Sequence, residues 1–250
     1  MTVSDHYTEV DAFDGQRVET PAAGQSKVWD LPVRLFHWTL VVAFVGAFVT
    51  NRLGVSYFKY HIWFGYTVIV LVSFRLLWGF VGTYHAQFHN FLRGPVATLH
   101  YAVRLVRGRA SSHLGHNPLG AWMVVFLLIG LGVQAVTGLF GNDDIFNIGP
   151  LAGYVTKDMS LRLTSLHRHS FYWIAAAIAV HVLAVVAHRI FDQSDLVRAM
   201  FTGRKRRSSA ADAGDISSSR TWLAFLLTVT IAGALAFVVT HAPIAVDDTF

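Results

Sequence analysis

The chain has 250 residues, of which 54% are hydrophobic and only 14% are charged. Soluble domains carry about 25% charged residues, so this composition excludes an ordinary water-soluble domain and predicts a membrane protein. Cysteine is absent, which excludes disulfides, cysteine-ligated iron–sulfur clusters, thiolate zinc sites and covalent haem attachment through C-x-x-C-H. The net charge of +5 is not gathered on one soluble face, so we expect a membrane orientation signal and no nucleic-acid partner.

Five apolar runs are long enough to cross a hydrocarbon layer of about 30 Å as helices. They cover residues 31–50, 60–82, 119–140, 166–190 and 221–240. We expect residues 1–27 to be disordered, residues 91–109 to form an amphipathic helix on the inner membrane surface, and residues 191–220 to form a basic loop. The predicted fold is all-α: an integral membrane helical bundle with a four-helix core over residues 28–190. A fifth transmembrane helix and an acidic tail follow over residues 221–250.

Lysine and arginine are divided unevenly between the segments that connect these runs. The N-terminal segment and the loops 83–118 and 191–220 hold 12 of them, whereas the other two loops and the tail hold 4. The positive-inside rule places the richer group in the cytoplasm. We therefore expect a multi-pass protein with a cytoplasmic N-terminus and a periplasmic C-terminus.

Four histidines interrupt the fourth run, which is otherwise almost purely apolar: His167, His169, His181 and His188. On a helix, His167 and His181 fall within about 40° of each other and about 21 Å apart along the axis. His169 points about 120° away from His181. His188 shares their face but lies close to the inner boundary.

Two histidines of other helices lie at matching depths. His37 lies on the inner side, like His181, and His61 lies on the outer side, like His167. Two imidazoles at one depth in a helical bundle suit an iron porphyrin that is bound axially from both sides. The sequence therefore predicts a di-haem core with two haems b, one on His37 and His181 and the other on His61 and His167. Such a pair would carry electrons across the membrane.

Histidines within membrane helices can also have other roles. A single one often serves as a hydrogen-bonding group or as part of a proton relay, but agreement of four in depth and face weakens that explanation. A metal-ion transporter is the main alternative. Transporters usually mix carboxylates with histidine, and the five apolar runs contain no Asp or Glu.

Several motifs resemble those of the bacterial di-haem cytochrome b family, which includes cytochrome b561 and the b-type subunits of nickel–iron hydrogenases. These motifs are VWDLPVRLFHW (28–38), HIWFG (61–65), FRLLWGFVG (74–82), HNPLGAWM (116–123) and QAVTGLF (134–140). The resemblance implies the same four histidine ligands and a place in the bacterial inner membrane. It also implies exchange of electrons with quinone and a redox partner, either a hydrogenase or a periplasmic multihaem c-type cytochrome. The fifth helix lies outside the family's four-helix core.

Three further residues are expected to support the haems. Arg75 is the only charge deep in the second run, so it needs an anionic partner, for which a haem propionate is the natural choice; snorkelling is the alternative. Arg34 is either a propionate contact or an orientation anchor. His188 is expected to support the haems by lining a propionate or contacting quinone; competition with His181 as a ligand is the alternative.

Three expectations remain about function. Quinone chemistry needs titratable groups near the membrane surface, for which the inner side offers His85, His89, His100, His113, His116 and His188. A stand-alone superoxide:quinone oxidoreductase would use the same four ligands, but the outer loops hold few basic residues and several acidic ones, which favours a protein partner. The fifth helix is expected to pack beside the core as a docking or assembly element.

Overall fold

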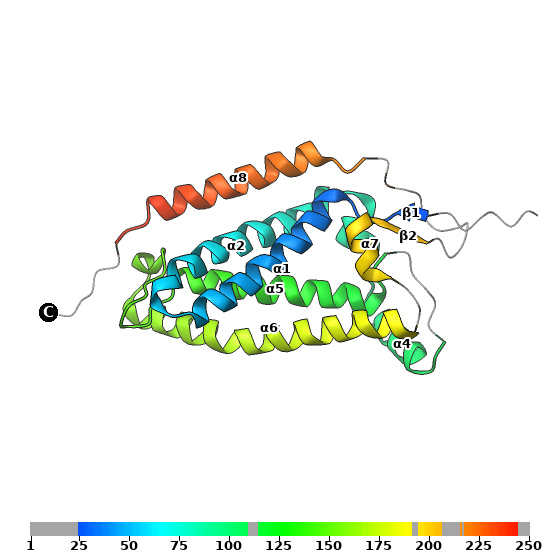
Figure 1. Cartoon of the computed structure of the whole chain (residues 1–250), viewed down its shortest axis with the longest axis horizontal. Helices are drawn as coiled ribbons and strands as arrows, with labels where there is room; N and C mark the ends of the chain where they lie inside the picture. Colours follow the sequence, from blue (N-terminus) through cyan, green and yellow to red (C-terminus); the bar gives the residue numbers. More distant parts are fainter. Residues whose placement is uncertain (1–24, 110–114, 192–194, 207–215, 217, 245–250) are drawn as a thin grey trace, which may run out of the picture.

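The structure is a computed structural model that describes residues 25–109, 115–191, 195–206, 216 and 218–244. Five long helices dominate it (Figure 1). They are α1 (Leu31–Arg52), α2 (Phe58–Val81), α5 (Pro118–Leu139), α6 (Lys157–Phe191) and α8 (Thr221–Thr240). Each is long and apolar enough to cross a membrane, which confirms the expected helical membrane bundle.

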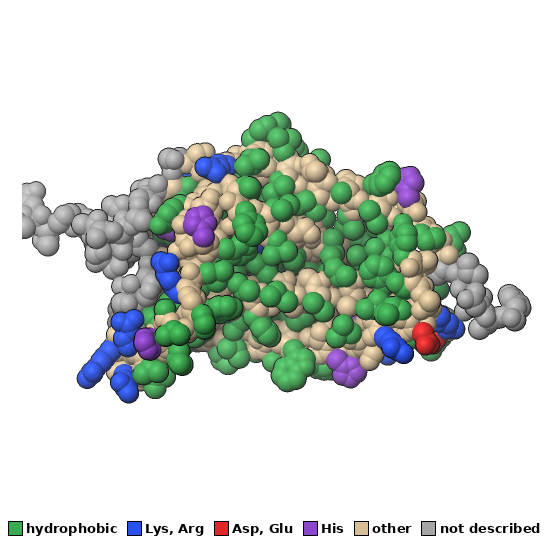
Figure 2. Space-filling model, turned by 180° about the vertical axis from the view of Figure 1, so that it is seen from behind, with side chains coloured by type: hydrophobic (Ala, Val, Ile, Leu, Met, Phe, Trp, Pro, Cys, Tyr) green, Lys and Arg blue, Asp and Glu red, His purple; other side chains and the backbone are tan. Residues whose placement is uncertain are grey.

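The long helices run alternately in opposite directions, so that α1, α5 and α8 begin at the end where α2 and α6 finish (Figure 1). Helix α2 packs against both α1 and α5, and α5 packs against α6, which forms the four-helix core. We call the end where α1 begins the basic end, because the arginines and lysines of α4, α7 and the two strands lie there; the other is the far end. Hydrophobic side chains cover the flank between the two ends (Figure 2).

Two helix starts are set by short polar side chains followed by proline. Asp30 accepts a hydrogen bond of 2.7 Å from the backbone N–H of Val33, and Asn117 accepts one of 2.7 Å from that of Gly120. These N-caps satisfy backbone donors that the first helical turn leaves unpaired. The prolines that follow them occupy the position where a missing N–H costs nothing.

Helix α6 begins nine residues before the predicted start of the fourth run. Its polar first turns are held by side-chain contacts: Ser160 Oγ donates to the carbonyl of Phe140 at 2.6 Å, and Thr164 Oγ1 donates to that of Asn142 at 2.9 Å. His167 therefore lies well inside the helix, where backbone hydrogen bonds hold it on both sides.

Smaller elements cover the basic end. They are β1 (Gln25–Lys27), β2 (Arg204–Arg206), α3 (Phe88–Phe91), α4 (Pro95–Val106), α7 (Leu196–Thr202) and the 3-10 helix η2 (Tyr84–Ala86). Two further 3-10 helices, η1 (Val55–Tyr57) and η3 (Ala152–Tyr154), lie in the connections at the far end. Strand β1 pairs antiparallel with β2. The segment expected to be disordered thus ends in a strand, and residues 1–24 lie outside the described residues. The expected basic loop contains a helix, α7, and a strand, β2. The backbone carbonyl of Gly203, between them, accepts hydrogen bonds from Val28 and Trp29 and so attaches this segment to the residues just before α1.

Helix α4 has one apolar face that the protein leaves uncovered. Val96, Leu99, Val103 and Val106 follow one another at helical spacing, and all four are exposed. Thr98 and Tyr101, on the other side, are buried. This pattern fits the predicted amphipathic helix on the membrane surface, with a shorter span than expected.

Helix α8 packs beside the core, mainly against α2 (Figure 1). Arg220 ties its start to the end of α2 through hydrogen bonds to the carbonyls of Val81 (2.9 Å) and Gly82 (3.3 Å). Ala224 is the only residue of α8 that is fully buried. The expected packing of this helix is present, while its docking role stays a prediction.

The core has two hydrophobic clusters along the bundle. The first lies near the basic end and includes Trp29, Phe74 and Trp78. The second occupies the middle and includes Val72, Leu131 and Ile174. Ile174 stands midway along α6 between His167 and His181. The second cluster therefore separates the levels at which the two histidine pairs were predicted.

Candidate functional site

The structure brings His61 of α2 and His167 of α6 together near the far end. Their ring centroids are 6.1 Å apart and the ring planes make an angle of 85°. Both side chains are partly buried. This is the outer pair that matching depth predicted.

Both rings of the outer pair are held through the same nitrogen. His61 Nδ1 lies 2.8 Å from the carbonyl oxygen of Ala47 in α1, and His167 Nδ1 lies 2.7 Å from that of Gln134 in α5. Because a carbonyl oxygen only accepts, each Nδ1 donates and carries the proton. The lone pair is then on Nε2, the nitrogen that a metal would take, in the arrangement usual for histidine ligands. All four core helices contribute to this level.

The ring separation fits a metal bound between the two imidazoles. Two metal–nitrogen bonds of about 2 Å, together with the ring radii, place the centroids roughly 6 Å apart. The backbone also leaves room there: a Cβ on Gly138 would lie only 2.9 Å from Cε1 of His167. A bis-histidine iron porphyrin therefore matches the donor set and the spacing at this level.

His169 lies outside this arrangement. It is exposed, and its Nδ1 lies 2.7 Å from the carbonyl oxygen of Ser165 in its own helix. Helical geometry predicted that this histidine points away from the ligand face.

The inner pair is His37 of α1 and His181 of α6. Both side chains are partly buried, and the two imidazoles are close enough to interact electrostatically. Nδ1 of His37 is buried and has no hydrogen-bond partner among the described residues. A buried polar atom without a partner costs about 1–3 kcal/mol, so a group that binds here is expected to engage this ring.

Arg75 is buried beside the inner level, with 2% of its surface exposed. Its guanidinium lies 5.1 Å from the ring centroid of Phe88 and 5.9 Å from that of Phe91. One terminal nitrogen is buried without a partner in the described part of the chain. The side chain therefore does not snorkel to the surface, and its position fits the carboxylate of a haem propionate.

Asp30 is a buried acid that interacts with Arg75, but its carboxylate oxygens already accept hydrogen bonds from other groups. Besides capping α1, Asp30 accepts hydrogen bonds from Trp78 Nε1 at 3.0 Å and Thr83 Oγ1 at 2.6 Å. Asp30 still attracts Arg75 electrostatically. The network fixes the start of α1 to the end of α2, and a terminal nitrogen of Arg75 remains without a hydrogen-bond partner among the described residues.

The other two predicted supporting residues lie at the same end. Arg34 has a buried Nε without a partner among the described residues. His188 Nε2 lies 3.4 Å from Nδ2 of Asn117, which also caps α5. His188 thus links the end of α6 to the start of α5. Of the inner histidines proposed for proton transfer, His113 lies outside the described residues.

Sequence reasoning missed the groups that orient the outer ligands. The acceptors are backbone carbonyls of Ala47 and Gln134, which no residue pattern reveals. Gln134 did carry a signal, because it is the only amide side chain in the third apolar run. Its Oε1 accepts a hydrogen bond from Ser170 Oγ, so Gln134 contacts α6 twice.

The described residues contain no group of three or more His, Asp or Glu side chains that could hold a bare metal ion. The histidines occur instead as pairs at two levels of a membrane bundle. This architecture defines a membrane cytochrome of the b type. The features that indicate it are the outer pair at 6.1 Å and the buried polar atoms at the inner level that lack a partner in the described part of the chain.

Comparison with known proteins agrees with this class. A model of the prokaryotic cytochrome b561 family matches residues 28–203, and the chain belongs to that family. The family is one of membrane electron-transfer proteins, and membership implies b-type haem. Helix α8 lies beyond the matched residues.

Three curated relatives are similar at low identity, and each is named a probable Ni/Fe-hydrogenase B-type cytochrome subunit. The protein from Rhodobacter capsulatus is 25% identical over 71% of this chain and 80% of its own length. The proteins from Azotobacter vinelandii and Cupriavidus necator are 25% and 23% identical over 70% of this chain, and over 86% and 85% of their own lengths. No solved structure matches the chain.

Proposed function

We propose that the protein carries electrons across the bacterial inner membrane through two haems b, between the quinone pool and a redox partner on the periplasmic side. The observation that carries the proposal is the outer pair, in which His61 and His167 lie 6.1 Å apart with both Nδ1 atoms engaged by carbonyls. Hydrogen bonds of this kind raise the basicity of the ligating nitrogen and fix the ring orientation.

The two histidine pairs would bind the two haems. His61 and His167 hold the outer haem, and His37 and His181 hold the inner one. Each haem, when bound, would carry one electron at a time. With two histidines holding each haem, the iron would have no site left for oxygen. The second hydrophobic cluster keeps water out between the two levels.

The basic end is assigned to the cytoplasm by the positive-inside rule. Arg75 and Arg34 lie at this end, each with a nitrogen that has no partner among the described residues, and would neutralise the inner propionates. His188 supports them through Asn117. In the reaction, one quinone, two electrons and two protons give one quinol, or the reverse.

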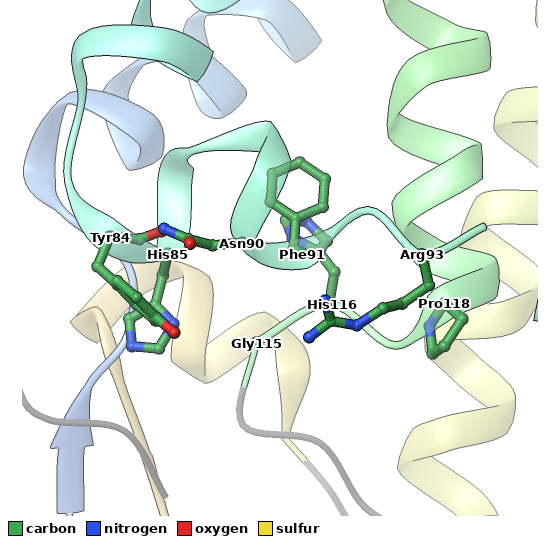
Figure 3. A pocket seen from close by; sticks show the side chains of 8 residues that line it. All are labelled: Tyr84, His85, Asn90, Phe91, Arg93, Gly115, His116 and Pro118. Carbon is green, nitrogen blue, oxygen red and sulfur yellow. The ribbon is translucent and has the colours of Figure 1, made fainter. Parts of the chain in front are cut away.

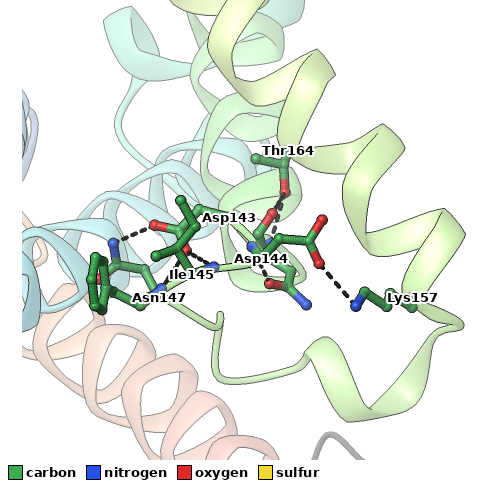
Figure 4. Close-up of polar contacts among 8 residues, drawn as sticks. Asp143, Asp144, Ile145, Asn147, Lys157 and Thr164 are labelled. Carbon is green, nitrogen blue, oxygen red and sulfur yellow. Dashed lines mark hydrogen bonds and ion pairs between the residues drawn. The ribbon is translucent and has the colours of Figure 1, made fainter. Parts of the chain in front are cut away.

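The partner is inferred from the names of the relatives and from charge at the far end. Those relatives are named as hydrogenase subunits, so a hydrogenase is the first candidate and a multihaem c-type cytochrome the second. Lys157, one of the few far-end cations, is paired with Asp144 at 3.0 Å (Figure 4). Because the far end has few cations and one of them is paired with an acid, it favours a protein partner over electrostatic attraction of superoxide.

Spectroscopy on the purified full-length chain tests the proposal. We expect a sharp b-type change in the reduced-minus-oxidised spectrum and two haems per chain in a pyridine haemochrome assay. Alanine at His167 should remove the outer haem and alanine at His181 the inner one, each leaving one haem. His169→Ala, the matched control on the same helix, should keep both. A chain without b-type absorption would refute the proposal.

The role of α8 is tested separately. Deleting residues 215–250 should leave both haems bound and weaken association with the partner, because α8 lies outside the core and buries little of its surface. Loss of haem on deletion would mean that α8 belongs to the haem-binding fold.

A further inference from the structure

A cavity of about 150 Å³ lies at the basic end (Figure 3). One side of it is formed by the chain between α2 and α4, and the other by the residues just before α5. Its lining includes Tyr84, His85, Phe91, Arg93, Gly115 and His116. The function described above does not use this cavity.

The cavity shares a wall with the inner level. The ring of Phe91 lies 4.8 Å from that of His116, and the guanidinium of Arg75 lies 5.9 Å from the centroid of the same Phe91 ring. His116 is also close enough to His181 for the two to interact electrostatically. A molecule in the cavity would therefore be separated from the inner level by about one layer of side chains.

Two neighbouring features place the cavity at the membrane–water interface. The exposed apolar face of α4 begins at Val96, three residues after Arg93, which lines the cavity. Trp122, in the second turn of α5 and 44% exposed, donates a hydrogen bond of 3.1 Å from Nε1 to the carbonyl of Arg93. Exposed tryptophans and amphipathic helices mark the headgroup level of a bilayer. A ligand here can have a polar head in the protein and a tail in lipid.

His116 supplies the polar chemistry of the cavity. Its ring packs edge-on against Trp29 at 4.6 Å, and its Nδ1 is buried without a partner among the described residues. Burial lowers the pKa of His116 to about 3, and the nearby positive charges of Arg75 and Lys205 add to the effect. The imidazole is therefore neutral at pH 7 and offers one donor and one acceptor nitrogen.

We propose that this cavity binds the headgroup of a quinone, with the ring beside Phe91 and one quinone oxygen hydrogen-bonded to His116. The inference rests on the proposed function, which requires an exchangeable quinone, and it adds the place and the residues. A cavity of about 150 Å³ holds one benzene-sized ring. The isoprenoid tail leaves along the apolar face of α4. The bound quinone takes up two electrons through the inner level and two protons from water at the basic end, or the quinol releases them.

Gly115→Leu tests the site by filling it. A Cβ on Gly115 would lie 3.7 Å from the nearest atom, His85 Nδ1, which is an ordinary contact distance. The backbone therefore accepts a side chain at this position, and the rest of the leucine side chain would occupy the cavity. Gly94→Leu is the matched control, because Gly94 lies close by, has open space around its Cβ position and does not line the cavity. His116→Leu removes the proposed hydrogen bond and keeps an apolar side chain of similar size.

Two readouts on the full-length protein in nanodiscs separate this inference from the proposed function. The first is photolabelling with an azidoquinone, which does not depend on haem. We expect label on residues 84–93 or 115–118 of the wild type and of Gly94→Leu, and its loss in Gly115→Leu. The second is anaerobic haem reduction by decylubiquinol, with dithionite reporting total haem. His116→Leu should raise the half-saturating quinol concentration about fivefold, the effect of losing one hydrogen bond of roughly 1 kcal/mol, at unchanged total haem. Gly115→Leu should raise it at least as much, because the added side chain occupies the cavity.

The outcomes are distinct. Labelling elsewhere in the chain, or wild-type quinol kinetics in Gly115→Leu, would overturn the cavity assignment while the haem assignment stands. Absence of haem with labelling of the cavity would overturn the proposed function and keep the quinone site. If decylubiquinol reduces no haem in the wild type and no label is incorporated, the cavity is not a quinone site.

Discussion

The Gly138→Ala substitution tests whether the outer site depends on the position of the His167 ring. The added Cβ would lie 2.9 Å from Cε1 and 3.1 Å from Nδ1 of that ring. Carbon atoms pack best at about 3.5 Å or more, so the ring must move by about 0.6 Å. His167 is not free to move, because Nδ1 is held at 2.7 Å by the carbonyl of Gln134. Moving away from residue 138 strains or breaks that hydrogen bond.

The expected cost is that of about one hydrogen bond, roughly 1 kcal/mol, or about a fivefold loss of outer-haem affinity. Gly132→Ala is the matched control on the same helix, since its Cβ would lie 3.6 Å from Val72, an ordinary contact. Haem content should be measured by titrating apoprotein with haem, with an optical redox titration to tell the two haems apart. Equal outer-haem affinity in the Gly138→Ala and Gly132→Ala variants would refute the placement of His167 as an outer ligand.

Three further predictions concern the basic end and the far-end loop. Asp30→Ala removes three buried hydrogen bonds at about 1 kcal/mol each, so it should lower the free energy of unfolding by roughly 3 kcal/mol and lower the melting temperature measured by circular dichroism; an unchanged melting temperature would contradict this. Arg75→Leu removes a positive charge beside the inner level, so the midpoint potential of one haem should fall, on the order of 60 mV for a tenfold change in its redox equilibrium. Arg75→Lys keeps the charge and should keep most of the wild-type potential. Equal shifts in both haems would count against the placement of Arg75 beside the inner haem. Partial burial raises the pKa of Asp143, but hydrogen bonds from the backbone N–H groups of Asn147 and Phe146, and from the Asn147 side chain, outweigh this and lower it to about 2 (Figure 4). Because this pKa is below the ordinary value of 3.8, the carboxylate stabilises its loop above about pH 4, and the stabilisation is lost as the pH falls toward 2. Hydrogen exchange of the backbone amides of residues 145–147 would detect this loss. Equal amide protection in Asp143→Ala and in the wild type would refute the prediction.

The membrane spans were predictable because hydropathy and length alone define a helix in lipid. Four of the five helices begin and end within two residues of the predicted runs. The exception is α6, whose first nine residues, from Lys157 to Ser165, are too polar for a hydropathy signal. Contacts with the preceding loop stabilise them instead. The pairing of β1 with β2 could not be predicted either, because it joins segments that are far apart in the sequence and no local pattern encodes it.

The approach of His61 to His167 could be predicted because helical geometry converts spacing into depth and face. The role of these histidines as haem ligands stays a prediction. His167 and His61 meet as that geometry requires, and His169 faces away. The surroundings of these residues could not be predicted in the same way. Carbonyl anchors, the orientation of Arg75 and the cavity beside His116 all depend on how separate helices and loops pack, which is a property of the tertiary structure.

A density map of the purified full-length protein in lipid would test the central assignment most directly. We expect two porphyrins, one between His61 and His167 and the other between His37 and His181, with about 21 Å between the levels at which α6 presents its two ligands. A map with no macrocycle at either level, or with these four rings turned toward the acyl chains, would contradict it.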